Sequence, residues 1–351
     1  MLIPIHQQAE RFFLACHSSS WVPDYLAERG FDRSTQRAWH IGYAPSEWRA
    51  LTNYLRGLGF SDTAIECSGL ARRTSRGTLI DFFRDRTMFP IKSHDGTTIA
   101  FIGRSLDAEP RYLNSPKTPI YRKRQTLFGL HALTLDTIPV ITEGPLDAIA
   151  VTLTGGEGLT GLALCGTALT ADHVRVLTRS LDLSRVVLAF DGDQAGRAAA
   201  ARSYPLFKGI CTADAVMLSA DRDPAGIFTE DGPAALATIL TEQTRPLADL
   251  VVDAAIDRWQ RSLEYAEGRV GALHSAGAAV AAMAPHDVAR QIARVAERLG
   301  FDHATVTEAV TDCVTSRLAG GDFPAPLAFG ATITRPKGRN PNERSLRGPT
   351  P

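Results

Sequence analysis

The sequence predicts a mixed α/β and α+β chain, in which a doubly wound parallel sheet lies between a basic α+β part and a helical part. Between residues 138 and 218, β-branched runs alternate with helical stretches of about ten residues, the pattern of a parallel sheet. Strand-like periodicity precedes this region, and helical periodicity follows residue 246. We therefore divide the chain into residues 1–130, 131–243 and 244–318, followed by a tail at 319–351.

The first part is predicted to be α+β. Residues 5–67 are expected to be helical, because apolar residues recur at helical spacing in HQQAERFFLA and EWRALTNYLRGL, and Gly30 and Gly59 stand where helices should stop. From Leu70 to Leu113 the pattern changes to short strands, TLIDFF, TMFPIKS and TTIAFIG, with Asp95-Gly96 as a turn.

The central part is predicted to be a doubly wound parallel sheet. Four strands are expected at IPVIT, GLALC, RVVLAF and ADAVML, and the helices between them at LDAIAVTL, ADHVRVLTR and GRAAAARS. In such a sheet the carboxyl ends of the strands lie at one edge, where ligands bind. The loops that follow these strands are therefore the first place to look for chemistry.

The last part is predicted to be helical, with residues 247–263, 285–299 and 304–318 as its clearest helices. Residues 319–351 are rich in Gly, Pro and basic residues and have no sustained apolar period. We expect them to form a disordered tail.

Charge is unevenly distributed along a chain whose formal net charge is zero. Residues 1–130 carry 18 Lys/Arg and 12 Asp/Glu, whereas residues 131–250 carry 8 and 15. A basic first part thus adjoins an acidic middle part, which leaves room for a nucleic-acid partner despite the neutral total.

Targeting signals and cysteine frameworks are not apparent in the sequence. No apolar run approaches the roughly 20 residues of a membrane span, and the N-terminus has no basic region followed by an apolar one. The cysteines are odd in number and never spaced as Cys-x-x-Cys, so we expect reduced thiols and no zinc site. They are Cys16, Cys67, Cys165, Cys211 and Cys313. We expect a cytoplasmic monomer with no membrane partner.

Carboxylates follow three of the four predicted parallel strands. Glu143 and Asp147 follow the first, Asp191 and Asp193 the third, and Asp223 the fourth. Each has a simpler explanation taken singly, because acids in a first helical turn and an Asp before a Pro commonly cap helices. Together at one edge they would repel one another unless a cation lay among them. A hard divalent ion, Mg²⁺ or Mn²⁺, would suit phosphoryl-transfer chemistry there.

Several motifs resemble one enzyme family. The acidic pattern of residues 143–147 and 191–193 resembles the signature of the TOPRIM domain, shared by bacterial primases, topoisomerases and some nucleases. The loop LCGTALT at 164–170 resembles that of the DnaG-type primases. The segments YLAERGF, IGYAP, FRDRTMFPI, FIGR and YLNSP follow one another in that family's order between residues 25 and 116. The resemblance covers roughly residues 5 to 315.

The resemblance implies a DNA primase, a nucleotidyltransferase of the DNA-directed RNA polymerase type that makes RNA primers for DNA replication. Its substrates would be single-stranded DNA and nucleoside triphosphates, with a replicative helicase or another partner that supplies template recognition. Carried onto matching positions, Glu143, Asp191 and Asp193 would be catalytic, and these three with Asp147 and Asp223 would bind the metal. The nucleotide- and template-binding residues would be Arg84, Arg86, Arg104, Asn114, Lys123, Gly166 and Thr167.

Two features depart from the family pattern. The last acidic loop reads Asp223-Pro224-Ala225 where the family has Asp-Pro-Asp, so we expect a second metal ion to be held weakly. The sequence also has neither the cysteines of the family's zinc ribbon nor the length for its helicase-binding domain. Two alternatives stay open: a TOPRIM-type nuclease, and a degenerate primase core that binds DNA or nucleotides without polymerising.

Overall fold

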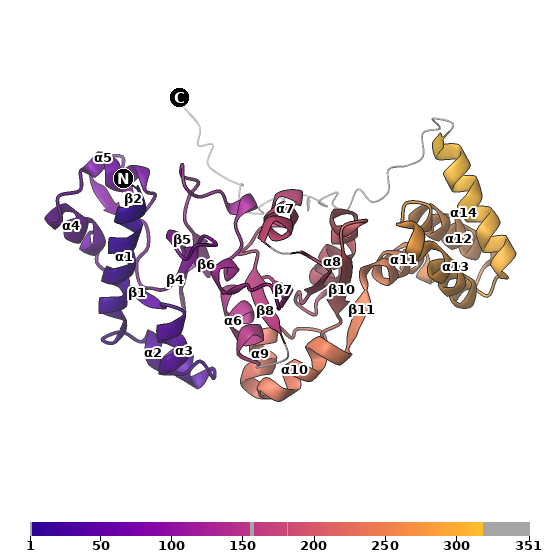
Figure 1. The fold of residues 1–351 in the computed structure, drawn as a ribbon, viewed down its shortest axis with the longest axis horizontal. Helices are drawn as coiled ribbons and strands as arrows, with labels where there is room; N and C mark the ends of the chain where they lie inside the picture. Colours follow the sequence, from indigo (N-terminus) through magenta and orange to yellow (C-terminus); the bar gives the residue numbers. More distant parts are fainter. Residues whose placement is uncertain (1, 155–157, 181, 319–351) are drawn as a thin grey trace, which may run out of the picture.

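The computed structural model describes residues 2–154, 158–180 and 182–318. The tail predicted at 319–351 lies outside these residues. Along the chain the elements form three neighbouring groups, with a first α+β group, a central parallel sheet and a final set of helices (Figure 1). This is the predicted fold class, although the predicted boundaries at 130 and 243 stay predictions. In the described part of the chain, no helix is long and apolar enough to cross a membrane.

The first group is built on a four-stranded antiparallel sheet of order β1-β4-β5-β6. Its strands are β1 (Gly42–Ala44), β4 (Arg86–Lys92), β5 (Thr98–Arg104) and β6 (Tyr112–Asn114). A separate two-stranded sheet joins β2 (Ala71–Arg73) and β3 (Leu79–Asp81). The helices of the group are α1 (Leu2–His17), α2 (Val22–Glu28), α3 (Arg33–Ala38), α4 (Ala50–Gly57) and α5 (Asp62–Cys67).

The prediction that residues 5–67 are helical is wrong at β1. This strand pairs with β4, and Gly42 lies so close to α1 that an added Cβ would be 2.6 Å from the Cβ of Phe13. Three residues are too few to show a strand period, so the sequence pattern could not reveal β1. The predicted helix stops are confirmed, because Gly30 and Gly59 have φ of +84° and +86° just after α2 and α4.

The central sheet has the order β11-β10-β9-β7-β8. Its parallel strands are β7 (Ile138–Thr142), β8 (Leu159–Ala163), β9 (Arg185–Leu188) and β10 (Thr212–Val216), and the edge strand β11 (Thr244–Pro246) is antiparallel. The sheet is covered on both faces, because Val140 and its neighbour Ile141 belong to different apolar cores. The predicted doubly wound sheet is therefore confirmed, with β11 as an unpredicted addition.

Helices on the two faces complete the sheet and lead into the last group. One core includes residues of α7 (Ala171–Ser180), α8 (Gln194–Phe207) and the C-terminal helices, and the other includes α6 (Pro145–Leu153), α9 (Pro224–Glu230) and α10 (Pro233–Glu242). The C-terminal helices are α11 (Leu247–Asp257), α12 (Ala266–Val280), α13 (Pro285–Leu299) and α14 (His303–Leu318). The helix predicted at 247–263 thus ends early, and Gln260–Ser262 forms a separate 3₁₀ turn.

His131 lies in a 3₁₀ turn, Leu130–Ala132, just before β7, with its ring edge-on to Trp39. Burial lowers its pKa to about 4, and the nearby charge of Lys92 and then His40 adds to this, against a smaller opposing effect of Glu10. The imidazole of His131 binds a proton more tightly in the unfolded chain than in the folded one. The free energy of unfolding should therefore decrease as the pH falls from about 6.5 to about 4.

We therefore expect His131→Phe to resist acid better than the wild type. The variant should keep roughly 2 kcal/mol more of its stability between pH 7 and pH 4.5, since it has no imidazole to protonate. Urea unfolding at both pH values measures the difference, with His94→Gln on an exposed hairpin as the control. Equal acid losses in His131→Phe and the wild type would contradict the assignment.

Candidate active site

Acidic side chains gather where the predicted loops meet at the carboxyl edge of the central sheet. Glu143 follows β7, Asp191 follows β9 and Asp223 follows β10, and with Asp147 from the first turn of α6 they line a cavity of about 260 Å³. The structure thus brings four of the five predicted metal-binding residues together. The fifth, Asp193, does not line the cavity but lies two residues beyond Asp191.

Close backbone contacts fix the loops that carry these acids. The Gly192 N–H donates to the carbonyl of Arg222 at 3.0 Å, and a Cβ on Gly192 would lie 1.8 Å from the Ser219 carbonyl oxygen. The Asp191 N–H donates to Oε1 of Glu143 at 3.3 Å. The loops after β7, β9 and β10 are therefore joined directly, and Gly192 is required by this close approach.

The clustered carboxyl groups are costly to ionise where they lie. Burial raises the pKa of Asp147 to about 8, with the charge of Asp223 as the next cause. Burial and then the charge of Glu143 raise the pKa of Asp191 to about 6, and burial likewise raises the pKa of Glu143. A positive group within the cavity would offset this cost, which is the property expected of a cation site.

Three of the acids also cap helices, which was the alternative explanation for each acid taken singly. Asp193 Oδ1 accepts the Gly196 N–H at 2.7 Å at the start of α8, and Asp223 Oδ1 accepts the Gly226 N–H at 2.5 Å at the start of α9. Both oxygens of Asp147 accept backbone N–H groups, from Gly144 at 3.1 Å and Ala225 at 3.0 Å. Capping and metal binding are compatible, because a carboxylate has about four lone-pair sites.

Cationic side chains from the first part of the chain line the same cavity. Arg104 is the most notable, because it is 2% exposed and its Nε and Nη1 have no hydrogen-bond partner among the described residues. Asn114 also lines the cavity, as predicted, and its Oδ1 is buried without a partner in that part of the chain. Arg29 and Arg111 were not predicted here, although Arg29 lies in the YLAERGF motif.

The other predicted arginines lie outside the cavity. Arg86 is 6% exposed, and its Nη1 donates to the carbonyls of Gly103, Pro110 and Arg111 at 2.9–3.3 Å, so it supports the backbone between β5 and β6. The guanidinium of Arg84 lies 4.3 Å from the ring centre of Trp48.

Trp48 is a candidate that sequence reasoning missed. Its side chain is 60% exposed, and the stacked guanidinium of Arg84 makes a flat cationic and aromatic surface beside it. Such surfaces suit stacked bases and phosphates of single-stranded nucleic acid. The signal was the Glu47-Trp48-Arg49 segment, in which periodicity alone treats the tryptophan as an ordinary apolar residue.

The loop after β8 completes the cavity edge. Gly166 lines the cavity, and the Lys123 ammonium group donates to its carbonyl at 3.2 Å, so these two predicted residues lie together. The Thr167 hydroxyl donates to the Leu164 carbonyl at 3.1 Å, which uses it within its own loop. Thr167 does not line the cavity.

The oxygen donors at this cavity suit an open Mg²⁺ or Mn²⁺ site better than a site in which protein side chains supply all the ligands. Within residues 2–154, 158–180 and 182–318 no three His, Cys, Asp or Glu side chains stand close enough to hold one ion together. Mg²⁺ usually takes only one or two protein carboxylates and keeps water and phosphate oxygens in its other positions. Glu143 and Asp191, both partly buried oxygen donors at one cavity, meet that requirement.

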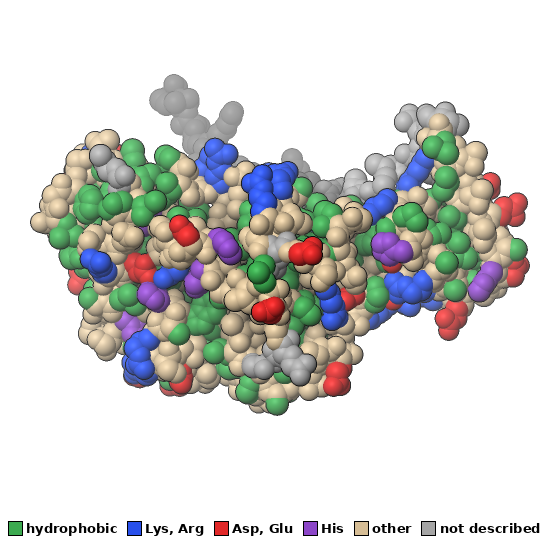
Figure 2. Space-filling view, in the orientation of Figure 1, with side chains coloured by type: hydrophobic (Ala, Val, Ile, Leu, Met, Phe, Trp, Pro, Cys, Tyr) green, Lys and Arg blue, Asp and Glu red, His purple; other side chains and the backbone are tan. Residues whose placement is uncertain are grey.

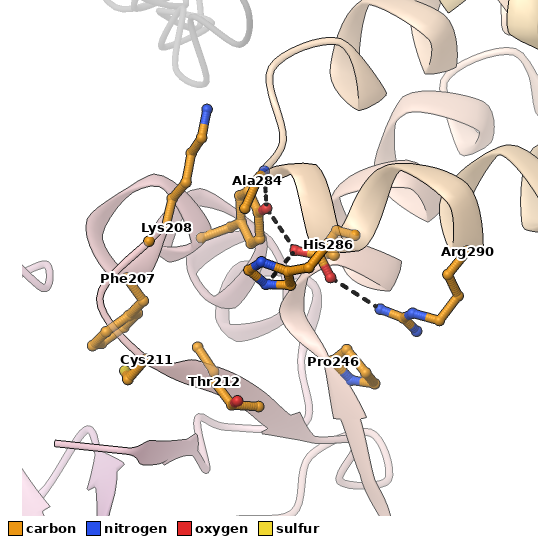
Figure 3. Close-up of a pocket in the computed structure, with 13 residues that line it drawn as sticks. Phe207, Lys208, Cys211, Thr212, Pro246, Ala284, His286 and Arg290 are labelled. Carbon is orange, nitrogen blue, oxygen red and sulfur yellow. Dashed lines mark hydrogen bonds and ion pairs between the residues drawn. The ribbon is translucent and has the colours of Figure 1, made fainter.

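A second cavity, of about 360 Å³, lies between α8 and the C-terminal helices (Figure 3), and three of its polar side chains already have partners. The Tyr204 hydroxyl donates to Asp287 at 2.8 Å, and the Arg290 guanidinium pairs with Asp249 at 2.6 Å. The Lys208 ammonium group donates to the Ala282 carbonyl at 2.6 Å. The first contact joins α8 to α13 and the second joins α13 to α11, so these groups serve packing and we place the chemistry at the sheet edge instead.

Comparisons with known proteins match both halves of this site. The family described as "DNA primase catalytic core, N-terminal domain" matches residues 12–134, and the family described as "Toprim-like" matches residues 140–228. A DNA primase of Streptomyces coelicolor is 34% identical over 92% of this chain, and the match covers 54% of the relative. The chain therefore spans about half the length of that curated relative.

Solved structures share this fold. A DNA primase domain from Pseudomonas aeruginosa has a TM-score of 0.74 and 28% identity, with 89% of this chain and all of that one covered. The RNA polymerase domain of the Mycobacterium tuberculosis primase DnaG, crystallised with a double-stranded DNA oligomer that has a 6-nucleotide overhang, has a TM-score of 0.72 and 30% identity. That match covers 86% of this chain and 98% of the other.

Proposed function

The chain belongs to the DnaG-type DNA primase family, as its catalytic core, and from that premise we propose that it synthesises short RNA primers on single-stranded DNA. The observation that carries the proposal is one cavity lined both by acids and by arginines with buried nitrogens that have no partner among the described residues. Glu143 and Asp191 come from the parallel sheet, whereas Arg29 and Arg104 come from the first part of the chain. A nucleoside triphosphate with its divalent ion carries the complementary charges.

The acids and the arginines have distinct tasks in nucleotidyl transfer. The guanidinium groups of Arg104 and Arg29 would bind and orient the triphosphate, since guanidinium donors match phosphate oxygens. Glu143 and Asp191 would hold the divalent ion, with Asp147 and Asp223 lining the same cavity. That ion, when bound, neutralises phosphate charge and lowers the pKa of an attacking hydroxyl. The hydrogen bond from the Asp191 backbone N–H to Glu143 keeps the two carboxylates close to each other.

The template would reach this cavity along the first part of the chain. Trp48 with Arg84 offers a stacking surface, and Lys123 adds a cation at Gly166. On the face shown in Figure 2, Lys and Arg side chains occupy separate places among acidic ones, so no continuous basic surface covers that face. A DNA-bound relative, the Mycobacterium tuberculosis domain, supports a DNA template.

A second divalent ion is expected to bind more weakly than the first. Ala225 lines the cavity beside Asp147 and is 3% exposed, and no carboxylate stands at this position. Calorimetric titration with Mn²⁺ should give two unequal sites, and Ala225→Asp should tighten the weaker one about tenfold or more. Ala225→Asn is the matched control without charge. Two equally tight sites in the wild type would contradict the expectation.

Primer synthesis is tested by incubating the chain with mixed single-stranded templates, Mg²⁺ or Mn²⁺ and labelled ribonucleotides. We expect short RNA oligomers that need both template and metal. Template degradation without incorporation would favour the nuclease alternative. Tight DNA or nucleotide binding with no product, with or without a helicase, would favour the degenerate core. We also propose that the chain acts as a cytoplasmic monomer and is brought to its template by a helicase or another partner.

A further inference from the structure

One aromatic ring contacts two of the cations of the active-site cavity. Tyr25, on α2, has the guanidinium of Arg104 at 4.8 Å and that of Arg29 at 5.6 Å from its ring centre. Arg104 also lies 5.8 Å from the ring centre of Tyr112. The Arg104 side chain, whose Nε and Nη1 have no hydrogen-bond partner among the described residues, thus contacts two aromatic rings.

Such an arrangement is unusual for a buried charge. Buried guanidinium groups are normally paired with a carboxylate or several carbonyls, because removing them from water is costly. Arg86, on the neighbouring strand β4, follows this rule with three carbonyl partners. Among the described residues Arg104 has no ion pair, so its free N–H groups remain available to an anion that enters the cavity.

The ring of Tyr25 is itself held in place by its neighbours. Trp21 packs edge-on against it at 5.6 Å, and the Trp21 indole N–H donates to Asp85 at 2.9 Å. The end of α2 is tied to α9, because the Thr229 hydroxyl donates to the Arg29 carbonyl at 2.9 Å. Tyr25 therefore lies where the first part of the chain meets the helix that follows Asp223.

The Tyr25 hydroxyl has no visible task in the protein. Its oxygen is buried and has no hydrogen-bond partner within the described ranges. The contacts that Tyr25 makes with Arg29 and Arg104 use the ring face, whose negative electrostatic potential attracts cations. Phenylalanine offers the same face, whereas leucine of similar bulk does not.

We propose that Tyr25 is a positioning residue whose ring face holds Arg29 and Arg104 toward the phosphate groups of the incoming nucleoside triphosphate. This inference rests on the proposed function, because it assigns the nucleotide to the same cavity. It adds that the two arginines are preorganised by an aromatic residue that does not itself line the cavity. Tyr25 acts through the two arginines and makes no contact with the reacting atoms.

The test is binding of Mg²⁺–ATP to the full chain, measured by calorimetry without DNA, so that it does not depend on polymerisation. Tyr25→Phe should bind within about twofold of the wild type, and Tyr25→Leu should bind about tenfold more weakly. The control is Tyr43→Leu, since Tyr43 packs on the same Trp21 ring at 6.1 Å. Its affinity should not change. Thermal unfolding of each variant shows whether it is folded.

A double-mutant cycle separates positioning from simple packing. In an Arg104→Gln background, Tyr25→Leu should lose little further affinity, because the cation it positions is gone. Equal losses in Tyr25→Phe and Tyr25→Leu, additive losses in the cycle, or wild-type binding by a folded Tyr25→Leu would each overturn the proposal. If the Mg²⁺–ATP affinities of the wild type and the variants follow this pattern but the wild type makes no primer, the proposed function fails while this inference stands.

Discussion

Replacing Asp191 by asparagine is expected to abolish primer synthesis while leaving the fold intact. Asp191 lines the cavity, and burial and then Glu143 raise its pKa to about 6. The amide keeps the size of the side chain but removes the negative charge that a divalent ion requires. We expect a fall of at least about 1,000-fold in the rate, about 4 kcal/mol in the activation barrier.

Stability should change in the opposite direction. Because the charged form of Asp191 is disfavoured in the folded protein, Asp191→Asn should unfold at the same temperature as the wild type or a higher one when no metal is present. Primer yield and thermal unfolding measure the two effects, with Asp95→Asn in an exposed turn as the control. Near-normal synthesis by a folded Asp191→Asn would show that the acidic side chains of the cavity have no part in the mechanism.

Gly192→Ala is expected to damage both the fold and the activity. An added Cβ would lie 1.8 Å from the Ser219 carbonyl oxygen, which is backbone and cannot turn away. The loops after β9 and β10 would have to separate, breaking the hydrogen bond from Gly192 to Arg222. We expect a loss of roughly 3 kcal/mol in unfolding free energy. Since a shift of about 1 Å can cost about 100-fold in rate, primer synthesis should fall at least that far.

Gly57→Ala provides the matched control for this substitution. Gly57 ends α4, and an added Cβ would meet nothing within 4 Å. Alanine favours helices over glycine by up to about 1 kcal/mol, so this variant should be as stable as the wild type or more so. Denaturant unfolding and primer assays compare the two variants. A Gly192→Ala protein with wild-type stability would show that the two loops are not in contact.

The parts of the fold that could be predicted are those whose pattern is local. The strand IPVIT is β7 to the residue, and 285–299 is α13, because each has a clear period and a clear boundary. The acidic edge could be predicted as well, since topology alone places the ends of parallel strands together. The strand RVVLAF was predicted too long, because β9 ends at Leu188 and Phe190 already belongs to the loop.

What could not be predicted depends on contacts between distant segments. Arg86 and Arg104 belong to motifs of equal apparent promise, yet one is paired with three carbonyls and the other has two free nitrogens at the cavity. Which of the two arginines keeps free nitrogens is decided only by how β5 and β6 fold. The need for glycine at position 192 could not be predicted either, because it comes from the close approach of Ser219 in another loop.

The most direct test is a crystal of the chain soaked with Mn²⁺ and a nonhydrolysable ribonucleoside triphosphate. We predict anomalous density for Mn²⁺ at the carboxylates of Glu143 and Asp191, and a triphosphate that fills the free N–H positions of Arg104. Density for the nucleotide elsewhere, as in the cavity between α8 and α13, would contradict the account. So would a metal ion bound away from the carboxyl edge of the sheet.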